Sequence, residues 1–169
     1  MAVLLAILTV SSIGMSEERN TIEGGETAKI VQHFTCHTAY TVEVCRSQIA
    51  ILRAALAPYH PERLGEWTWV LVRSEDWKPI LRRVGKDLDS PIFTILEKRQ
   101  TFVEEALLVP IAARRGELLR KWSLPLNELL DFAIVHELVH AYCYQLDERR
   151  TEEDAHRSHH EKRLSCRSR

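Results

Sequence analysis

The chain has 169 residues, of which 45% are hydrophobic and 28% charged, and its formal net charge at pH 7 is -1. This length and composition are typical of one globular domain. A net charge so close to zero argues against nucleic acid as the main partner, because nucleic-acid-binding surfaces carry an excess of Lys and Arg.

The N-terminus carries an apolar run at residues 2–10 that is followed by small residues. This pattern resembles the apolar core and cleavage site of a secretory signal, and it is too short to span a bilayer. We therefore expect a signal peptide at residues 1–14, a flexible linker at 15–25 and a single domain at 26–169, with export to the periplasm or the medium and no stable membrane insertion. No Lys or Arg precedes the run, so a buried N-terminal segment is the alternative.

The four cysteines, Cys36, Cys45, Cys143 and Cys166, form an even set. Four cysteines permit two disulfides in three connectivities, and disulfides fit an exported protein. A Cys45–Cys143 bridge would join a C-terminal helix to an earlier one. The alternative is a free, buried cysteine that packs as a small hydrophobic residue.

The first half of the domain begins with apolar residues at helical spacing in residues 42–59, where two prolines end the pattern. Residues 67–72 are aromatic and β-branched, which predicts a strand. A helix is predicted at residues 74–84, with Ser74 as its N-cap.

Two short strands are then predicted at residues 92–96 and 101–103, with a charged turn at 97–100 between them. A charged helix follows at 111–122. Strands and helices in this order predict an α+β fold in which a small, mostly antiparallel sheet packs on helices.

The most informative motif is His136-Glu137-Leu138-Val139-His140, inside an apolar run at residues 126–144. Residues four apart lie on one face of a helix, so both imidazoles can reach one Zn²⁺ ion while Glu137 lies beside them. The alternative is a core helix whose histidines only satisfy hydrogen bonds. Glu137 argues against it, because glutamate is rarely buried without a partner.

A catalytic zinc usually has three protein ligands, so one more ligand is required. A straight continuation of the helix would carry the chain ~12 Å beyond His140 by Glu148, so the chain must turn, and Asp147 can be the N-cap of a new helix. We expect Glu148 to be the third ligand. The alternatives are Glu152, Glu153, Asp154, His156, His159 and His160.

The chain resembles the small gluzincins, zinc metallopeptidases in which HExxH is followed on a second helix by a glutamate ligand, and in particular short exported bacterial proteins of this type. The matching residues are HELVHAYC at 136–143 and DERRT at 147–151. The chain departs from the pattern at Thr151, where a small apolar residue is usual, and at Val139, where glycine is common. The EEDA at 152–155 also fits the Glu-x-x-Ala pattern.

The resemblance implies a zincin-like fold and a zinc-dependent peptidase, in which Glu137 is the general base for a zinc-activated water. The expected partner is a peptide or protein substrate that pairs with an exposed strand, at residues 92–96 or 101–103. Two alternatives remain. One is a catalytically silent domain that binds a partner or a structural zinc, and the other is a latent enzyme whose first 25 residues block the cleft.

Overall fold

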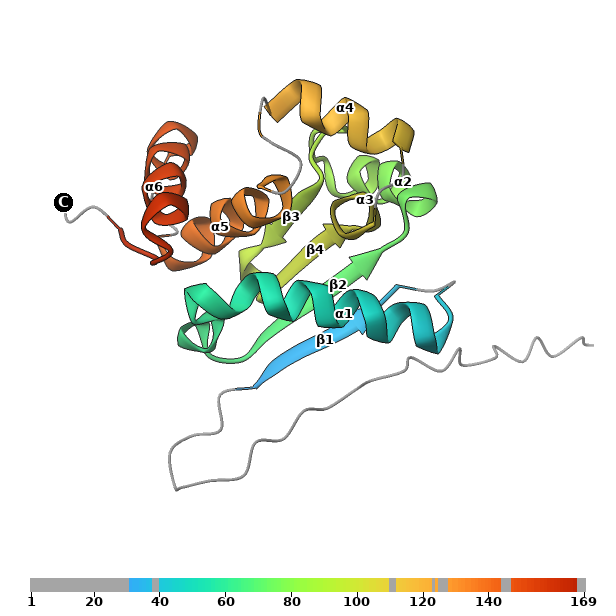
Figure 1. The fold of residues 1–169 in the computed structure, drawn as a ribbon, viewed down its shortest axis with the longest axis horizontal. Helices are drawn as coiled ribbons and strands as arrows, with labels where there is room; N and C mark the ends of the chain where they lie inside the picture. The colour runs from blue at the N-terminus through green and yellow to red at the C-terminus, as the bar shows by residue number, and fades with distance from the viewer. Residues whose placement is uncertain are drawn as a thin grey trace, which may run out of the picture.

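The computed structural model describes residues 31–37, 40–109, 112–122, 124, 128–143 and 147–166. The predicted signal peptide (1–14) and linker (15–25) lie outside this range. The predicted blocking role of the first 25 residues therefore concerns residues that are not described. The strands are β1 (Gln32–Cys36), β2 (Trp67–Val72), β3 (Ile92–Ile95) and β4 (Gln100–Glu104). The helices are α1 (Val42–Leu56), α2 (Ser74–Val84), α3 (Glu105–Leu108), α4 (Ala112–Trp122), α5 (Leu129–Tyr142) and α6 (Glu148–Glu161), and Figure 1 shows their arrangement.

The strands form one sheet in the order β1-β2-β4-β3. The α+β class is confirmed, but the expectation of a mostly antiparallel sheet is wrong, because β1–β2 and β2–β4 are parallel and only β3–β4 is antiparallel. The physical reason is the α1 crossover, which returns the chain to the sheet in its original direction. Sequence analysis predicted no strand at β1, the partner that this crossover requires.

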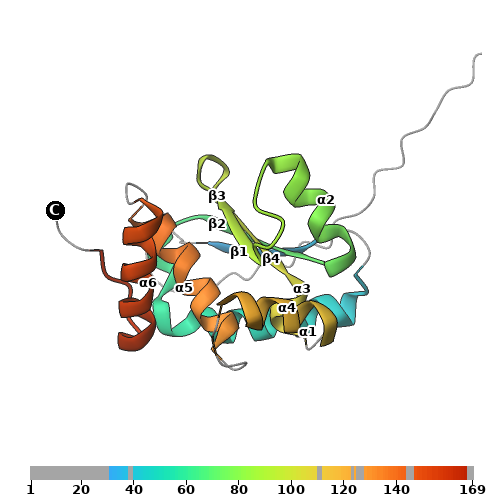
Figure 2. The same ribbon diagram turned by 90° about the horizontal axis from the view of Figure 1, so that it is seen from above.

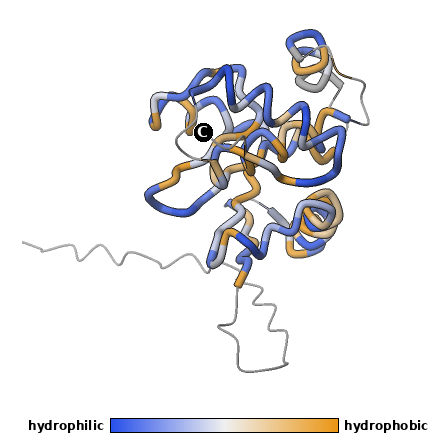
Figure 3. The backbone as a smooth tube through the Cα atoms, turned by 90° about the vertical axis from the view of Figure 1, so that its left-hand side faces the viewer, coloured by the Kyte–Doolittle hydropathy of each residue, from blue (hydrophilic) through white to orange (hydrophobic). Residues whose placement is uncertain are grey.

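The sheet separates two groups of buried side chains. Trp69 and Leu71 of β2 pack on the side of α1 and α5, whereas Val70 and Val72 pack with Trp77 of α2 on the opposite face. This alternation follows from the two-residue period of a strand. Figure 2 shows α1, α3 and α4 on one side of the sheet and α2 on the other. In Figure 3, which colours the backbone by hydropathy, hydrophilic and hydrophobic residues alternate along the helical parts of the chain.

The predicted elements of the first half are largely confirmed. The helix predicted for residues 42–59 is α1 followed by a 3₁₀ turn at Ala57–Tyr59, and the strand at 67–72 is β2. The helix at 74–84 is α2, but Ser74 is its first residue and Arg73 is the N-cap, so that cap assignment is wrong. The side chain of Glu105 supplies the missing acceptor, since its Oε2 accepts a hydrogen bond from the Ser74 N–H at 3.4 Å.

The two disulfides join Cys36 to Cys45 and Cys143 to Cys166. Two bridges were expected, but the Cys45–Cys143 pairing is wrong. Cys36 ends β1 and Cys45 lies in the first turn of α1, so the unpredicted strand carries the true partner of Cys45. Among the described residues, no helix is long and apolar enough to cross a membrane.

Candidate metal centre

Helix α5 carries the HExxH motif through the interior of the protein. Nine of its residues are buried, including His136 and Glu137, and His140 is partly buried. The nearly continuous apolar sequence explains this burial, because a helix that is hydrophobic on all sides is covered on all sides. The Nε2 atoms of His136 and His140, one turn apart, lie 3.2 Å from each other. Packing of the core therefore fixes the position of both imidazoles.

Glu148 is the first residue of α6, and its carboxylate lies against both histidines. Its Oε1 is 3.0 Å from Nε2 of His136 and its Oε2 is 3.2 Å from Nε2 of His140. As expected, Asp147 is the N-cap of this helix, and its side chain accepts a hydrogen bond from the Arg150 N–H at 2.9 Å. The chain thus turns after α5, and this turn brings Glu148 back to the motif.

These three side chains have the donor atoms and the spacing of a zinc site. Tetrahedral zinc with bonds of about 2.0–2.1 Å separates neighbouring ligand atoms by ~3.3 Å. The two imidazole nitrogens are 3.2 Å apart, and one donor atom from each of the three residues lies within 4.8 Å of the others, with a different Glu148 oxygen nearest to each histidine. Among the described residues, His136, His140 and Glu148 are the one group of three or more His, Cys, Asp or Glu that can hold a metal ion. Two imidazoles and a carboxylate leave a fourth position for water or substrate.

The other candidate ligands lie in different surroundings. Glu152 and His160 are exposed, and Glu153 forms an ion pair with Arg149. Asp154 is buried against Arg157. His156 lies against the ring of Phe132, and His159 forms an ion pair with Asp131 at 3.0 Å. The group around His136 and His140 includes none of these six residues.

A cleft of about 470 Å³ opens onto the three side chains, and Glu137 lines it. Glu137 is only 8% exposed, so the residue is largely shielded from bulk solvent although it lines the cleft. The other walls come from β3, from the loop at residues 86–91 and from Lys121 of α4. The cleft therefore brings a further acidic side chain, that of Glu137, to the same surface as the three candidate ligands.

Burial lowers the pKa of His140 below its ordinary value of 6.5. The charges of Glu137 and Glu148 act in the opposite direction, whereas His136 and Lys86 lower this pKa further. The net direction favours the neutral imidazole, which is the form that coordinates a metal.

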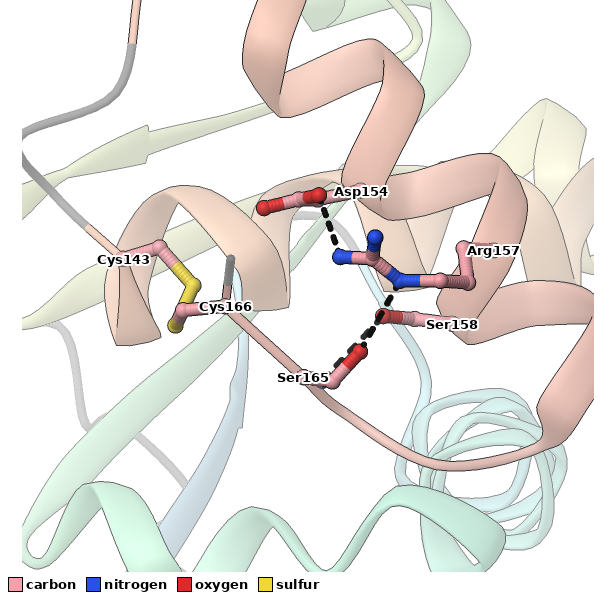
Figure 4. Close-up of a disulfide and its surroundings, with 6 residues drawn as sticks. All are labelled: Cys143, Asp154, Arg157, Ser158, Ser165 and Cys166. Atoms are coloured by element: carbon pink, nitrogen blue, oxygen red, sulfur yellow. Dashed lines mark hydrogen bonds and ion pairs between the residues drawn. A yellow bond between two sulfur atoms is a disulfide. The ribbon is translucent and has the colours of Figure 1, made fainter. Parts of the chain in front are cut away.

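Figure 4 shows contacts that hold the C-terminal part of α6, the helix that begins at Glu148. The Cys143–Cys166 disulfide joins the residue after α5 to the segment after α6. Arg157 contacts Asp154 and donates from Nε to Oγ of Ser165 at 3.3 Å, and Ser165 N–H donates to Oγ of Ser158 at 3.3 Å. These contacts fold the C-terminal segment back onto α6.

A second set of contacts joins α6 to α5 directly. Asp131 of α5 accepts a hydrogen bond from the hydroxyl of Tyr59 at 2.9 Å, pairs with His159 and contacts the ammonium of Lys162. Burial, followed by the hydrogen bond and the charge of Asp131, raises the pKa of Tyr59 well above its ordinary value. This junction, the disulfide and the contacts of Glu148 with the two histidines therefore all connect the helices that carry the candidate ligands.

Strand β3 forms the edge of the sheet beside the cleft. Hydrogen-bonded pairs and non-hydrogen-bonded pairs alternate along an antiparallel ladder. The Glu104 N–H donates to Pro91 O, so the pairs that contain Ile92 and Thr94 are non-hydrogen-bonded pairs. The backbone N–H and C=O groups of Ile92 and Thr94 therefore point away from β4. Ile92 O accepts a hydrogen bond from the Ser90 hydroxyl at 2.5 Å. Of the two strands considered for substrate pairing, residues 101–103 lie in β4, which is paired on both sides and therefore closed to a further strand.

Sequence reasoning missed the loop at residues 86–91 as part of the cleft. Trp77 donates from its ring nitrogen to Ser90 O at 2.6 Å, and Lys121 forms an ion pair with Asp87 at 3.0 Å. Backbone N–H of Asp89 and the Lys121 ammonium hold the pKa of Asp87 below its ordinary value. These contacts join residues distant in sequence, so no local pattern could have indicated them.

Comparison with protein-family models, with curated proteins and with solved structures finds no match to this chain.

Proposed function

We propose that this protein is a zinc-dependent peptidase with a gluzincin-type ligand set. The observation that carries the proposal is the convergence of His136, His140 and Glu148 beside a cleft that Glu137 also lines. Two imidazoles, one carboxylate and an adjacent buried glutamate match the requirements of zinc hydrolases. Two disulfides in a chain of this size support an oxidising compartment, and we include export in the proposal.

The proposed chemistry assigns a separate role to each side chain. A zinc ion held by the two histidines and Glu148 would supply Lewis acidity that polarises the scissile carbonyl and lowers the pKa of water. Glu137 accepts a proton from the attacking water and delivers it to the leaving amine nitrogen. The low exposure of Glu137 keeps this proton transfer away from bulk solvent.

The proposed substrate is an extended peptide or protein segment that lies along β3. The N–H and C=O of Thr94 point to the open edge of the sheet and are oriented to pair with the main chain of a substrate. Main-chain pairing gives affinity without dependence on sequence, and side chains that line the cleft then determine specificity.

The first test is the zinc stoichiometry of purified full-length protein, measured by elemental analysis after zinc loading and buffer exchange. We expect about one zinc per chain in the wild type, and loss of zinc in His136→Ala and in Glu148→Ala. Removal of a ligand weakens binding by more than the roughly 10–100-fold that follows loss of a residue that only hydrogen-bonds to a ligand. Glu152→Ala is the matched control on the same helix and should retain zinc. Retention by Glu148→Ala together with loss in Glu152→Ala would reassign the third ligand.

The second test separates an enzyme from a silent zinc domain. We expect wild-type protein to cleave a mixed peptide library, and Glu137→Gln to bind zinc but cleave about 10²–10⁴-fold more slowly, because the general base is lost. Glu161→Gln, at the exposed end of α6, removes the same charge outside the cleft and should leave the rate unchanged. Full zinc binding without cleavage by the wild type would favour the silent domain.

A further inference from the structure

A second cavity, of about 520 Å³, lies beside the cleft at the other end of β3. Leu96, which directly follows β3, lines both cavities, and Ala141 and Tyr142 of the second cavity directly follow His140 of the first. Leu96 is 37% exposed. The two cavities therefore adjoin at Leu96 and at the end of α5, and together they are called here the β3 groove.

The cleft end of the β3 groove has one cation without a carboxylate partner. Lys121 is paired with Asp87 at 3.0 Å and lies 3.8 Å from Asp89. The side chain of Lys86 is exposed and has no ion pair with any residue that the structure describes. Its position is fixed by the end of α2, where Lys86 N–H donates to Leu81 O after Gly85 in the left-handed conformation.

The far end of the β3 groove has two guanidinium groups and one carboxylate, those of Arg63, Arg99 and Glu97. Arg99 donates from Nε to Glu66 O at 2.7 Å, contacts Leu64 O and lies over the ring of Trp67 at 5.5 Å. Carbonyl oxygens orient a guanidinium but leave its charge uncompensated. The backbone of Arg99 is also left-handed, at φ 52°, a conformation that costs an arginine free energy and is concentrated at functional sites.

We propose that the β3 groove binds an acidic peptide segment, with one substrate carboxylate near Lys86 and another near Arg63 and Arg99. The inference rests on the proposed peptidase function and names its substrate class. At the far end, Arg63 and Arg99 exceed Glu97 by one positive charge. At the cleft end, Lys86 and Lys121 lie with Asp87, Glu137 and Glu148, and the two charges of a bound zinc ion would leave one positive charge in excess there as well, although the whole chain carries a net charge of -1. Complementary charge at both ends would select acidic sequences and set their register along β3.

The expected selectivity is modest, because both ends of the groove are open to solvent. An exposed ion pair contributes about 0.2–1 kcal/mol, so two pairs correspond to about a two- to thirtyfold preference for a substrate with both carboxylates. Added salt should reduce this preference, because it screens exposed charges.

The test is peptide binding by fluorescence anisotropy, with zinc-loaded full-length protein carrying Glu137→Gln so that peptides stay intact. The probes are fluorescein-labelled peptides of about nine residues with two glutamates at varied separations, each paired with a twin that has glutamines instead. We expect glutamate peptides to bind at least twofold more tightly than their twins at one or more separations. Adding Arg63→Gln and Lys86→Gln should abolish the preference for glutamate peptides. The control pair, Lys78→Gln and Arg83→Gln on the exposed surface of α2, removes the same charge and should preserve that preference.

Equal binding of glutamate and glutamine peptides, a preference that survives Arg63→Gln and Lys86→Gln, or no binding of any glutamate peptide would each overturn the inference. Arg99 is left intact because its contacts with Leu64, Glu66 and Trp67 also stabilise the fold. Failure of the peptidase proposal gives a different result, namely wild-type protein that shows the binding preference but cleaves no peptide.

Discussion

Helices α5 and α6 each carry candidate zinc ligands, but they hold them in different ways. Helix α5 is buried over most of its length, and His136 is 6% exposed. Helix α6 is mainly polar, its buried residues are Thr151, Asp154, Ala155 and Ser158, and the side chain of Glu148 is 73% exposed. Two ligands are thus positioned by the hydrophobic core, whereas the third lies on a helix that adds Ala155 to that core and is otherwise held by a disulfide and polar contacts.

This difference assigns separate tasks to the two helices. A core helix gives the precision that a metal site needs, because side chains in a closely packed interior have few alternative positions. A polar helix at the surface can close the site without burying another charge in the core. Disrupting α5 should therefore cost mainly stability, and disrupting the attachment of α6 should cost mainly zinc affinity.

The largest expected effect is a loss of stability when one of two matched leucines is replaced by alanine. Leu138 of α5 is 0% exposed, and Leu164 after α6 is 7% exposed. Leu138→Ala should lower the free energy of unfolding by about 3–5 kcal/mol, because the surrounding core cannot close over the cavity. Leu164→Ala should cost about 2 kcal/mol, because the surrounding chain is freer to relax. Urea unfolding with the disulfides intact measures both, and equal losses would contradict the comparison.

A smaller effect on stability, with a distinct effect on zinc, is expected from the two disulfides. The Cys143–Cys166 bridge spans 23 residues and Cys36–Cys45 spans 9. Loop-closure entropy predicts losses of about 3.4 and 2.7 kcal/mol when each pair is replaced by serines. Only the Cys143→Ser, Cys166→Ser protein should also bind zinc about tenfold more weakly, which corresponds to ~1.4 kcal/mol for the loss of order at Glu148.

Zinc titration with a competing chelator provides the second measurement. The Cys36→Ser, Cys45→Ser protein is the matched control, because its bridge joins β1 to α1 and touches neither ligand helix. Equal zinc affinity in both serine variants would show that α6 holds Glu148 without its disulfide. It would leave the ligand assignment intact and remove the dependence on the C-terminal attachment.

The sequence was sufficient to predict the elements whose signals are local. The apolar run around His136, the aromatic and β-branched residues of β2 and the N-cap at Asp147 each determine local structure within a few residues, and all are confirmed. The proximity of Glu148 to the histidines was also predicted, since a turn after the motif helix was required for any carboxylate that follows it to return to the histidines.

The features that sequence analysis missed depend on contacts between distant residues. Strand β1 has one buried residue, Phe34, and pairs with β2 across a helix, so its sequence lacks a clear period. The parallel β1–β2 pair and the partner of Cys45 both follow from this strand. The cleft wall at residues 86–91 likewise depends on Trp77 and on Lys121, which is 34 residues from Asp87.

The smallest expected effect concerns the junction of Tyr59 and Asp131. The pKa of Tyr59 is raised in the folded protein. Below about pH 10 the phenol is neutral in both the folded and the unfolded protein, so the Tyr59 contacts contribute fully to stability there. Above that pH the unfolded chain loses the proton first, and the free energy of unfolding falls as pH rises. Tyr59→Phe should cost about 1 kcal/mol at neutral pH, from the lost hydrogen bond, and should flatten the decline between about pH 9 and 11.

Urea unfolding of metal-free protein across that pH range measures the decline, with Tyr40→Phe as the control. Burial also raises the pKa of Tyr40, but its charged neighbours are Glu105, Arg73, Asp76 and Glu75, away from the α5–α6 junction. Both variants should therefore flatten the decline. Only Tyr59→Phe should also weaken zinc binding, since only Tyr59 supports the Asp131 contacts that hold the end of α6 on α5. Equal zinc affinity in the two variants would mean that the disulfide alone is enough to hold Glu148 at the histidines.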